Sequence, residues 1–505
     1  MIGIFYFSMM VLSGILANHP CIITHFSVPA SWVGQKALYR NWNQSSLRNI
    51  IFSTRNPQKG FAYGRAGIWR TYNNGKTFIP FMEGLPNSAP FRNIYDLYWD
   101  EKESRLFAGT EAGLFVCELD SDGKAWEICA LDGDGEAILS LFAFKNHIMA
   151  ITDSHFFLSD NSPPFHFKEI SPRTPAPFRP KKTDIATLML NIHNGSILGL
   201  PGKILIDFAG FAILFLSLSA FYIWYYPVHA KRRRKKKKGI SYYQLSLFRF
   251  FHKYHSKLGI WTIPLVLIIS LTSFLIFLPI SSWQSILIFT LNFNSNDITD
   301  KNPWKEKIEK ALYNPDTQKI MILTKDGLIE WDRNLQSPWK KLTINLPPRL
   351  MGASVFRYTP KDKSYLIGSL SGLYKVDPVS GSIDYLRKGG KKITRVCGYL
   401  KKPNGDEYYV HKEKGLKLII TCSGNPGPIL MPEAIAKNSK TSLWKFCSDL
   451  HSGRIFKPLL GQNTWWLMPF IGTLILLCLA LTGAYDWYYW KHVREKINMD
   501  LSYNL

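Results

Sequence analysis

ILIDFAGFAILFLSLSAFYIWYY occupies residues 204–226 and is one of three long apolar stretches in the chain. The other two are LGIWTIPLVLIISLTSFLIFLPI at residues 258–280 and WWLMPFIGTLILLCLALTGAYDWYYW at residues 465–490. About 20 apolar residues suffice to cross the roughly 30 Å hydrocarbon core of a bilayer. Helices of soluble cores seldom stay apolar on every side for so long. The sequence therefore predicts an integral membrane protein.

A fourth and shorter apolar stretch, IGIFYFSMMVLSGILA, lies at residues 2–17. A secretory signal peptide is the alternative interpretation, but such a peptide carries basic residues before its apolar part, and none stands here. We therefore expect an α-helical membrane part with four spans, at residues 1–19, 203–227, 258–280 and 464–490.

Basic residues indicate the orientation of these spans. The net charge is +25, and KRRRKKKK at residues 231–238 falls between the second and third spans. Short loops rich in Lys and Arg stay in the cytoplasm, where they face the lipid bilayer. The loop 228–257 and the tail 491–505 are thus expected inside, and the segments 20–202 and 281–463 outside. A nucleic-acid-binding arm is the alternative for this basic run, but its position between two spans argues against a nucleic-acid partner.

The two outer segments carry a finer repeat. A glycine directly followed by an apolar residue recurs after β-rich runs. TDSHFFLS takes the matching place near His155. The glycines are Gly67, Gly113, Gly327, Gly372 and Gly415. A period of about 40–45 residues with short alternating strands is typical of β-propeller blades. We expect three blades in each segment. The two segments either complete one six-bladed ring or form two separate all-β domains.

The two halves of the chain are also similar at the membrane. The second span ends in LSAFYIWYYP and the fourth in LTGAYDWYYW. Ahead of these spans, a His-x-Gly sequence stands at His193 and again at His451. Such parallel repeats usually pack about an axis along the membrane normal.

These membrane-edge motifs resemble the PepSY-associated transmembrane family of bacterial inner-membrane proteins, which includes ferric-siderophore reductases. The resemblance rests on LSGILANHP, IHNGSILG, LHSGRIF, HKYHSKLGIW and LTGAYDWYYW, which cover about a quarter of the chain. It implies a multi-pass protein of the bacterial inner membrane with periplasmic outer segments. The propeller-like segments depart from the usual PepSY domain, so the resemblance leaves the substrate open.

Histidines cluster at the edges of the spans. Those expected at the outer edge are His19, His25, His193 and His451, and those at the inner edge are His229, His252, His255 and His492. Neutral imidazole is a good axial ligand for haem iron. We expect an outer haem b held by His19, His193 and His451 and an inner one held by His252 and His255, an arrangement that the family resemblance also implies. The alternative is that these side chains are only amphipathic groups of the headgroup region.

The sequence thus favours a transmembrane electron-transfer protein that reduces an outer acceptor, with a ferric siderophore or another iron chelate as the expected acceptor. No catalytic residue is assigned. The sequence lacks a Gly-rich phosphate loop, a zinc HExxH pair and a GxSxG elbow, which disfavours ATP-driven and hydrolytic activities. The alternative function is a membrane-anchored propeller that senses or scaffolds extracytoplasmic protein partners without catalysis.

Overall fold

The computed structural model describes residues 2–23, 26–33, 38–120, 125–132, 136–160, 162–173, 185–237, 239, 241–277, 302–332, 335, 337–347, 349, 352–422, 424, 427–437, 440–461 and 464–489. The chain forms two compact units. The helical unit comprises residues 1–24, 180–299 and 443–505, and the propeller unit comprises residues 25–179 and 300–442. Each unit is therefore assembled from pieces that are far apart in the sequence.

Three helices of the helical unit are long and apolar enough to cross a membrane. They are α5 (Gly199–Lys235), α6 (Tyr242–Phe277) and α11 (Leu467–Tyr488). They correspond to the expected spans at 203–227, 258–280 and 464–490. A further helix, α1 (Ile2–Asn18), is apolar but has only 17 residues. Membrane anchoring thus rests on the three long helices.

The segment 228–257, expected as a loop, is largely helical. α5 continues through the basic run to Lys235, and α6 begins at Tyr242. Lys and Arg are good helix formers, and cations near a helix C-terminus interact favourably with the helix dipole. The basic run therefore extends α5 instead of ending it.

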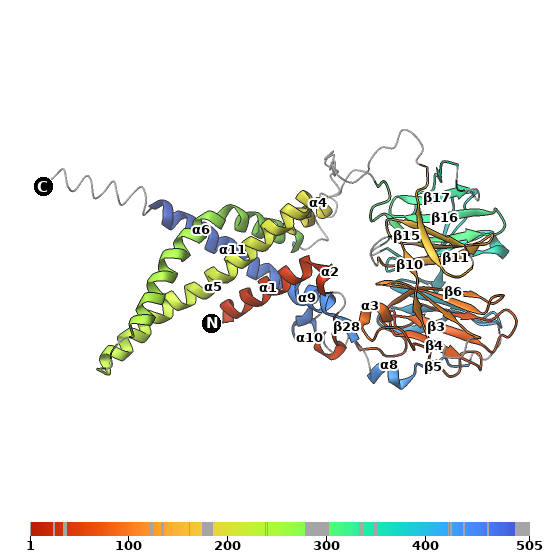
Figure 1. The fold of residues 1–505 in the computed structure, drawn as a ribbon, viewed down its shortest axis with the longest axis horizontal. Coiled ribbons are helices and arrows are strands. Elements are labelled where there is room, and N and C mark those ends of the chain that lie inside the picture. The colour runs from red at the N-terminus through yellow and green to blue at the C-terminus, as the bar shows by residue number, and fades with distance from the viewer. Residues whose placement is uncertain are drawn as a thin grey trace. The chain divides into compact units, whose positions relative to one another are not determined.

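Shorter helices complete the helical unit, namely α2 (Pro20–Ile23), α4 (Ile185–His193), α9 (Leu443–His451) and α10 (Lys457–Leu460). α5 packs against α1 and α6, and α6 also packs against α11. α4 lies against α6, whereas α9 lies against α1 (Figure 1). Small residues allow this close packing: a methyl group at Gly210 of α5 would lie 3.1 Å from Ile15 of α1.

The described residues of the propeller unit form six sheets of three to five strands. Residues 25–179 contribute three of them, whose strands are β2 (Asn49–Phe52), β3 (Gly60–Gly64), β4 (Gly67–Thr71) and β5 (Ile79–Pro80); β6 (Ile94–Asp100), β7 (Arg105–Thr110), β8 (Gly113–Glu118) and β9 (Glu127–Ile128); and β10 (Ala130–Leu131), β11 (Ser140–Phe144), β12 (His147–Ile151), β13 (Phe156–Asp160) and β14 (His166–Ile170).

Residues 300–442 contribute the other three sheets. Their strands are β15 (Ile308–Asn314), β16 (Lys319–Thr324), β17 (Gly327–Asp332) and β18 (Lys340–Lys341); β19 (Ala353–Thr359), β20 (Ser364–Ser369), β21 (Leu373–Val376) and β22 (Ile383–Tyr385); and β25 (Val396–Lys401), β26 (Glu407–His411) and β27 (Gly415–Ile420). Two small antiparallel pairs accompany them: the hairpin of β23 (Arg387–Lys388) with β24 (Lys391–Lys392), and the pair of β1 (Ser27–Pro29) with β28 (Lys440–Ser442), whose strands are far apart in sequence.

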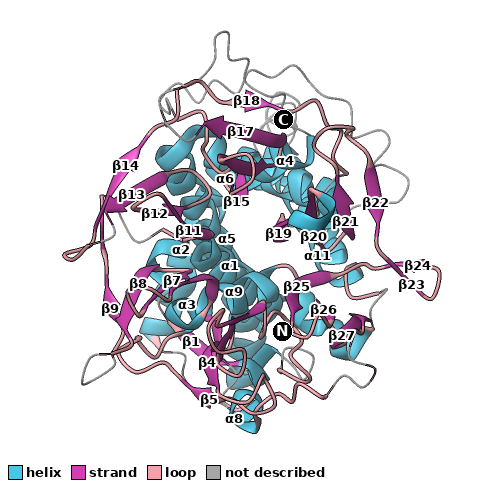
Figure 2. Ribbon diagram, turned by 90° about the vertical axis from the view of Figure 1, so that its right-hand side faces the viewer, coloured by secondary structure: helices cyan, strands magenta, loops and turns pink. Residues whose placement is uncertain are grey.

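The six sheets close into one ring, which Figure 2 shows along its axis. β6 contacts β11, β11 contacts β15, β15 contacts β19, and β19 contacts β25. Contacts of β25 with β2 and of β3 with β6 complete the circle. Apart from β10, which pairs parallel with β14, the neighbouring strands of each sheet are antiparallel and follow one another in sequence order, as in a β-propeller blade. The two segments therefore form a single ring of sheets, not two separate β domains.

Four of the five repeated glycines open the third strand of their blades, and the fifth, Gly372, directly precedes β21. Gly67, Gly113, Gly327 and Gly415 have φ of 88°, 121°, 136° and 73°, in the left-handed region that glycine adopts without strain. In the third blade, where glycine is missing, the Thr152 hydroxyl accepts hydrogen bonds from the amides of Ser154 and His155. The repeat of about 40–45 residues seen in the sequence thus marks the turn between the second and third strands of each blade.

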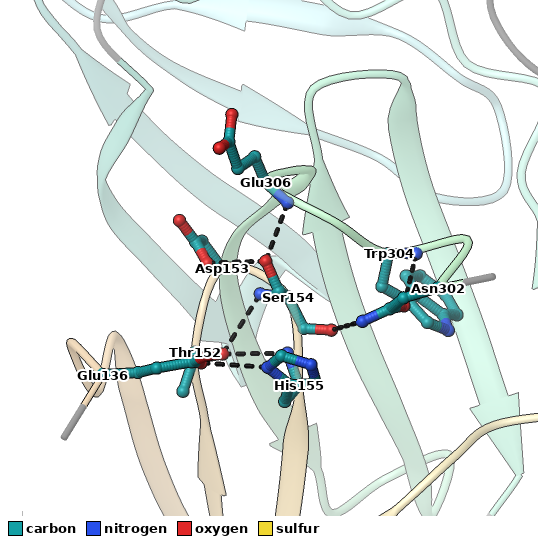
Figure 3. A network of polar contacts seen from close by, with 8 residues as sticks. All are labelled: Glu136, Thr152, Asp153, Ser154, His155, Asn302, Trp304 and Glu306. Atoms are coloured by element: carbon teal, nitrogen blue, oxygen red, sulfur yellow. Dashed lines mark hydrogen bonds and ion pairs between the residues drawn. The ribbon is translucent and has the colours of Figure 1, made fainter. Parts of the chain in front are cut away.

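The third and fourth blades meet across a polar seam (Figure 3). The amide of Ile308 donates to Asp153 O at 2.9 Å, and the amide of Glu306 donates to Ser154 Oγ at 2.8 Å. The side-chain amide of Asn302 donates to Ser154 O at 2.9 Å. These bonds join the two segments of the propeller unit, because Asp153 and Ser154 belong to the first segment and the others to the second.

Loss of one seam bond should weaken the ring. Asn302→Ala should lower the free energy of unfolding of the propeller unit by about 1–2 kcal/mol, because the Ser154 carbonyl loses its donor. Asn56→Ala is the matched control, since the Asn56 side chain lies on an exposed turn, and it should cost less than about 0.5 kcal/mol. Chemical denaturation followed by β-sheet circular dichroism measures both. Equal losses would contradict a special role for the seam.

Lys310 of β15 also joins the two segments. Its Nζ donates to Leu139 O and, at 3.2 Å, to Tyr95 O. Burial lowers the pKa of Lys310 from 10.5 to about 8; the Asp96 carboxylate opposes this shift, and the Arg48 guanidinium adds to it. The protonated Lys310 ammonium is therefore less stable in the folded protein than in water.

Stability should consequently rise between about pH 8 and pH 10.5. In this range the folded protein has released the Lys310 proton while the unfolded chain still holds it, so proton release favours folding. Below pH 8 both states hold the proton and the gain is absent. The full shift corresponds to about 3 kcal/mol. Unfolding midpoints measured against pH should show this rise in the wild type and lose it in Lys310→Met.

Candidate functional site

The site begins with two short helices that share one local structure. α4 and α9 each have nine residues and end at a histidine, His193 and His451. Each is followed by a left-handed glycine, with φ of 79° at Gly195 and 73° at Gly453, and then by a 3₁₀ turn. The His-x-Gly motif therefore places a histidine at a helix end and reverses the chain directly after it.

The two motif histidines meet in the interior of the helical unit. Their ring centroids lie 6.2 Å apart, with an angle of 42° between the ring planes. Both rings line a cavity of about 100 Å³ whose other walls come from α1, α5, α6 and α11. Polar side chains at its wall include Ser270, which is 1% exposed and whose hydroxyl has no partner among the described residues.

Hydrogen bonds fix the tautomer of each ring. His451 Nδ1 lies 2.7 Å from the carbonyl oxygen of Met10, which can only accept, so Nδ1 carries the proton. His193 Nδ1 lies 3.2 Å from Thr272 Oγ1. The Thr272 hydroxyl donates to the Ile268 carbonyl at 2.7 Å, so it accepts from His193. In His451 Nε2 is therefore the unprotonated nitrogen, which is the one able to bind a metal. The Thr272 contact favours the same tautomer in His193, where the Ile269 carbonyl is a second acceptor beside the ring.

α1 can approach His451 because it carries Gly14. A methyl group at this position would lie 2.7 Å from Cε1 of His451, closer than real side-chain atoms approach one another. The glycine thus leaves room for the imidazole ring between α1 and α9.

Gly14→Ala should displace the His451 ring and lower the unfolding temperature of the helical unit, because the ring loses both its space and its bond to Met10. The control is Gly483→Ala on α11, where a methyl group meets nothing within 4 Å and helix propensity should improve slightly. Thermal unfolding in detergent, followed by helical circular dichroism, compares the two. The close contact is unimportant if both variants melt together.

His19, expected with the outer pair, lies elsewhere in the helical unit. Its Nε2 is 2.5 Å from Asp207 Oδ2 of α5, and the Asn18 amide donates to the other carboxylate oxygen at 3.4 Å. The structure thus gives Asp207 a partner that sequence reasoning did not anticipate. His19 does not line the cavity of His193 and His451.

The expected inner pair comes from one helix. His252 and His255 both lie on α6, three residues apart, so their side chains project from neighbouring positions of the same face. His255 Nδ1 is 2.8 Å from Ser219 Oγ, which itself donates to the Phe215 carbonyl. Its Nε2 is therefore unprotonated too. Two residues so placed cannot hold one macrocycle from opposite sides. His25 and His492 lie outside the described residues.

Within the part of the chain that the structure describes, no group of three or more His, Cys, Asp or Glu side chains could hold a metal ion. A bare zinc site needs three or four protein ligands. Two imidazoles with free Nε2 atoms instead suit a cofactor that brings its own remaining donors, as haem does with its four ring nitrogens. The donor chemistry of His193 and His451 thus fits haem better than a free ion.

Comparisons with known proteins identify no family: no protein-family model and no curated protein matches the chain. Solved structures match at low similarity. The extracellular domain of a B. thetaiotaomicron protein described as a hybrid two-component system has 10% identity and a TM-score of 0.36, with 77% of this chain and 35% of that chain covered. The WD40 β-propeller domain of Doa1 has 8% identity and a TM-score of 0.34, with 80% and 84% covered. The chain thus spans about a third of the first of these proteins.

Proposed function

We propose that the helical unit binds one haem between His193 and His451 and carries electrons within a membrane. The observation that supports this proposal is the pair of helix-end imidazoles in one intramembrane cavity, each with a free Nε2. A ligand nitrogen lies about 2 Å from a bound metal, and the ring centre lies slightly more than 1 Å behind the nitrogen. The ring centres of His193 and His451 lie 6.2 Å apart, so both imidazoles would be near enough to hold one iron.

The two imidazoles suit an iron, but the cavity as it stands is smaller than a macrocycle. Pockets for ligands of porphyrin size have volumes of about 300–1,000 Å³, whereas the cavity holds about 100 Å³. Flexible side chains such as Met10 and Leu476 line it, and binding requires them to move aside. Bound haem would supply an iron that accepts and releases one electron.

Groups of the chain itself would orient both imidazole rings. The Met10 carbonyl and the Thr272 hydroxyl accept from the Nδ1–H groups, which fixes the ring orientation and makes Nε2 more basic. Both acceptors belong to membrane helices, α1 and α6, and each histidine arrives on a separate helix. The site is therefore built from facing elements, as a ligand pair of one iron requires.

The wider proposal concerns topology and substrate. We infer four spans in two related halves, with α1 as the first, and place the basic turn between α5 and α6 in the cytoplasm of a bacterium. The propeller unit would then lie on the periplasmic side of the inner membrane. A ferric siderophore or other iron chelate would be the electron acceptor, as the resemblance to the PepSY-associated family suggests. His19 is left out of the ligand set because Asp207 engages its Nε2.

An absorption spectrum of the full chain, purified in detergent, tests the proposal. The wild type should show a Soret band that sharpens and shifts on reduction with dithionite. His193→Ala and His451→Ala should each remove the six-coordinate signal, because either change deletes one axial ligand. His229→Ala is the control, since among the described residues His229 bonds only to Tyr225 on the same helix, and its spectrum should match the wild type.

A folded and colourless wild-type protein would contradict the haem proposal. It would favour the non-enzymatic alternative, in which the helices anchor a propeller that binds extracytoplasmic partners. Retention of the six-coordinate signal in both histidine variants would show that other residues hold the haem.

A further inference from the structure

The propeller unit contains a cavity of about 360 Å³ that the redox proposal does not use. This volume lies within the range of pockets for small molecules. Its floor is apolar and aromatic, with Tyr39, Trp69, Met82 and Ile435. Trp69 and Ile435 are 5% and 4% exposed, and the indole N–H of Trp69 already donates to Ala66 O at 2.9 Å. The floor therefore offers ring and methyl surface without competing polar groups.

Three cations line the same cavity, namely Arg65, Arg92 and Lys440, and no carboxylate does. They come from separate parts of the propeller unit: the turn between β3 and β4, α3 (Ala89–Arg92) and β28. Among the described residues, none of the three forms an ion pair. The positive charge of the cavity wall is thus not neutralised within the wall itself.

The hydrogen bonds of these cations leave donors free. Arg92 is fixed by neutral acceptors only, at 3.1 Å from both Pro86 O and Leu85 O and at 3.0 Å from the Met82 sulfur. A guanidinium has five N–H groups, so two remain unused. Burial lowers the pKa of Arg92, because the surroundings of its guanidinium stabilise the positive charge less than water does.

The other two cations are still less engaged. In the part of the chain that the structure describes, the Lys440 ammonium contacts only Asn87, at 3.3 Å from its carbonyl and 3.2 Å from its side-chain oxygen. The Arg65 side chain makes no hydrogen bond with a described residue and is exposed to the cavity. Glu111 acts on Arg65 electrostatically, but its carboxylate accepts from Asn93 and does not line the cavity.

We propose that this cavity binds a small organic anion whose carboxylate, phosphate or similar head contacts Arg65, Arg92 and Lys440 and whose apolar body lies on Trp69 and Ile435. Charge-assisted bonds to Arg and Lys are the stronger hydrogen bonds of proteins, and a planar head can accept two at once from a guanidinium. An anion would neutralise the wall and complete the donor set. This inference is independent of haem binding.

Isothermal titration of the full-length protein in detergent with naphthalene-2-carboxylate tests the proposal, with naphthalene-2-methanol as the uncharged counterpart. The carboxylate should bind saturably with one site, and the alcohol at least about tenfold more weakly, the difference expected for about 1.4 kcal/mol. Lys440→Met and Arg65→Met should each weaken the carboxylate about tenfold and leave the alcohol unchanged.

Two further variants separate binding from folding. Lys102→Met removes an exposed lysine outside the cavity wall and should bind as the wild type does. Ala434→Trp keeps all three cations but fills the cavity from α8 (Glu433–Lys437), so it should abolish binding without lowering the unfolding temperature. The proposal is overturned if the carboxylate does not bind saturably, if the alcohol binds equally well, or if Ala434→Trp retains binding.

Discussion

Closure of the ring of sheets is the constraint on which the propeller unit depends. An open stack of blades would leave unpaired edges and exposed apolar faces at both ends. Because each segment supplies only three sheets, neither can close alone. The contacts of β11 with β15 and of β25 with β2 are where the two segments meet. Seam bonds at Ser154 and the reach of Lys310 to two blades of the first segment concentrate polar interactions at one of these junctions.

The helical unit is subject to a comparable constraint. α4, which precedes α5 in the chain, packs on α6, while α9, which precedes α11, packs on α1. Each motif histidine thus bonds to a helix of the other half: His193 to Thr272 and His451 to Met10. This exchange brings two residues that are far apart in sequence into one cavity. A mutation on α1 or α6 can therefore alter the geometry of a histidine that it does not flank.

The sequence predicted the three long apolar helices and the blade period, and it singled out His193 and His451, which line one cavity in the structure. The length of an apolar stretch and the spacing of glycines can be read directly from the sequence, because neither depends on contacts between distant residues. It did not predict Thr272, Gly14 or the carbonyl of Met10 as the groups that orient the histidines, because inside an apolar helix such residues look like ordinary packing. Nor did it predict that His19 would pair with Asp207 and lie outside the cavity. The cationic cavity was missed for the same reason, since Arg65, Arg92 and Lys440 come together only when the ring closes.

The length of α5 has a mechanical consequence. Its 37 residues span about 55 Å at 1.5 Å per residue, far more than the roughly 30 Å of hydrocarbon. With α6 it forms a stiff hairpin whose tip is strongly cationic. Attraction to anionic headgroups decays over about 8 Å at physiological ionic strength. Lys231 follows Tyr226, the last residue of the apolar stretch, by five residues, or about 7.5 Å along the helix. The first cations of the tip would therefore lie within reach of anionic headgroups, while the later ones would extend into the aqueous phase.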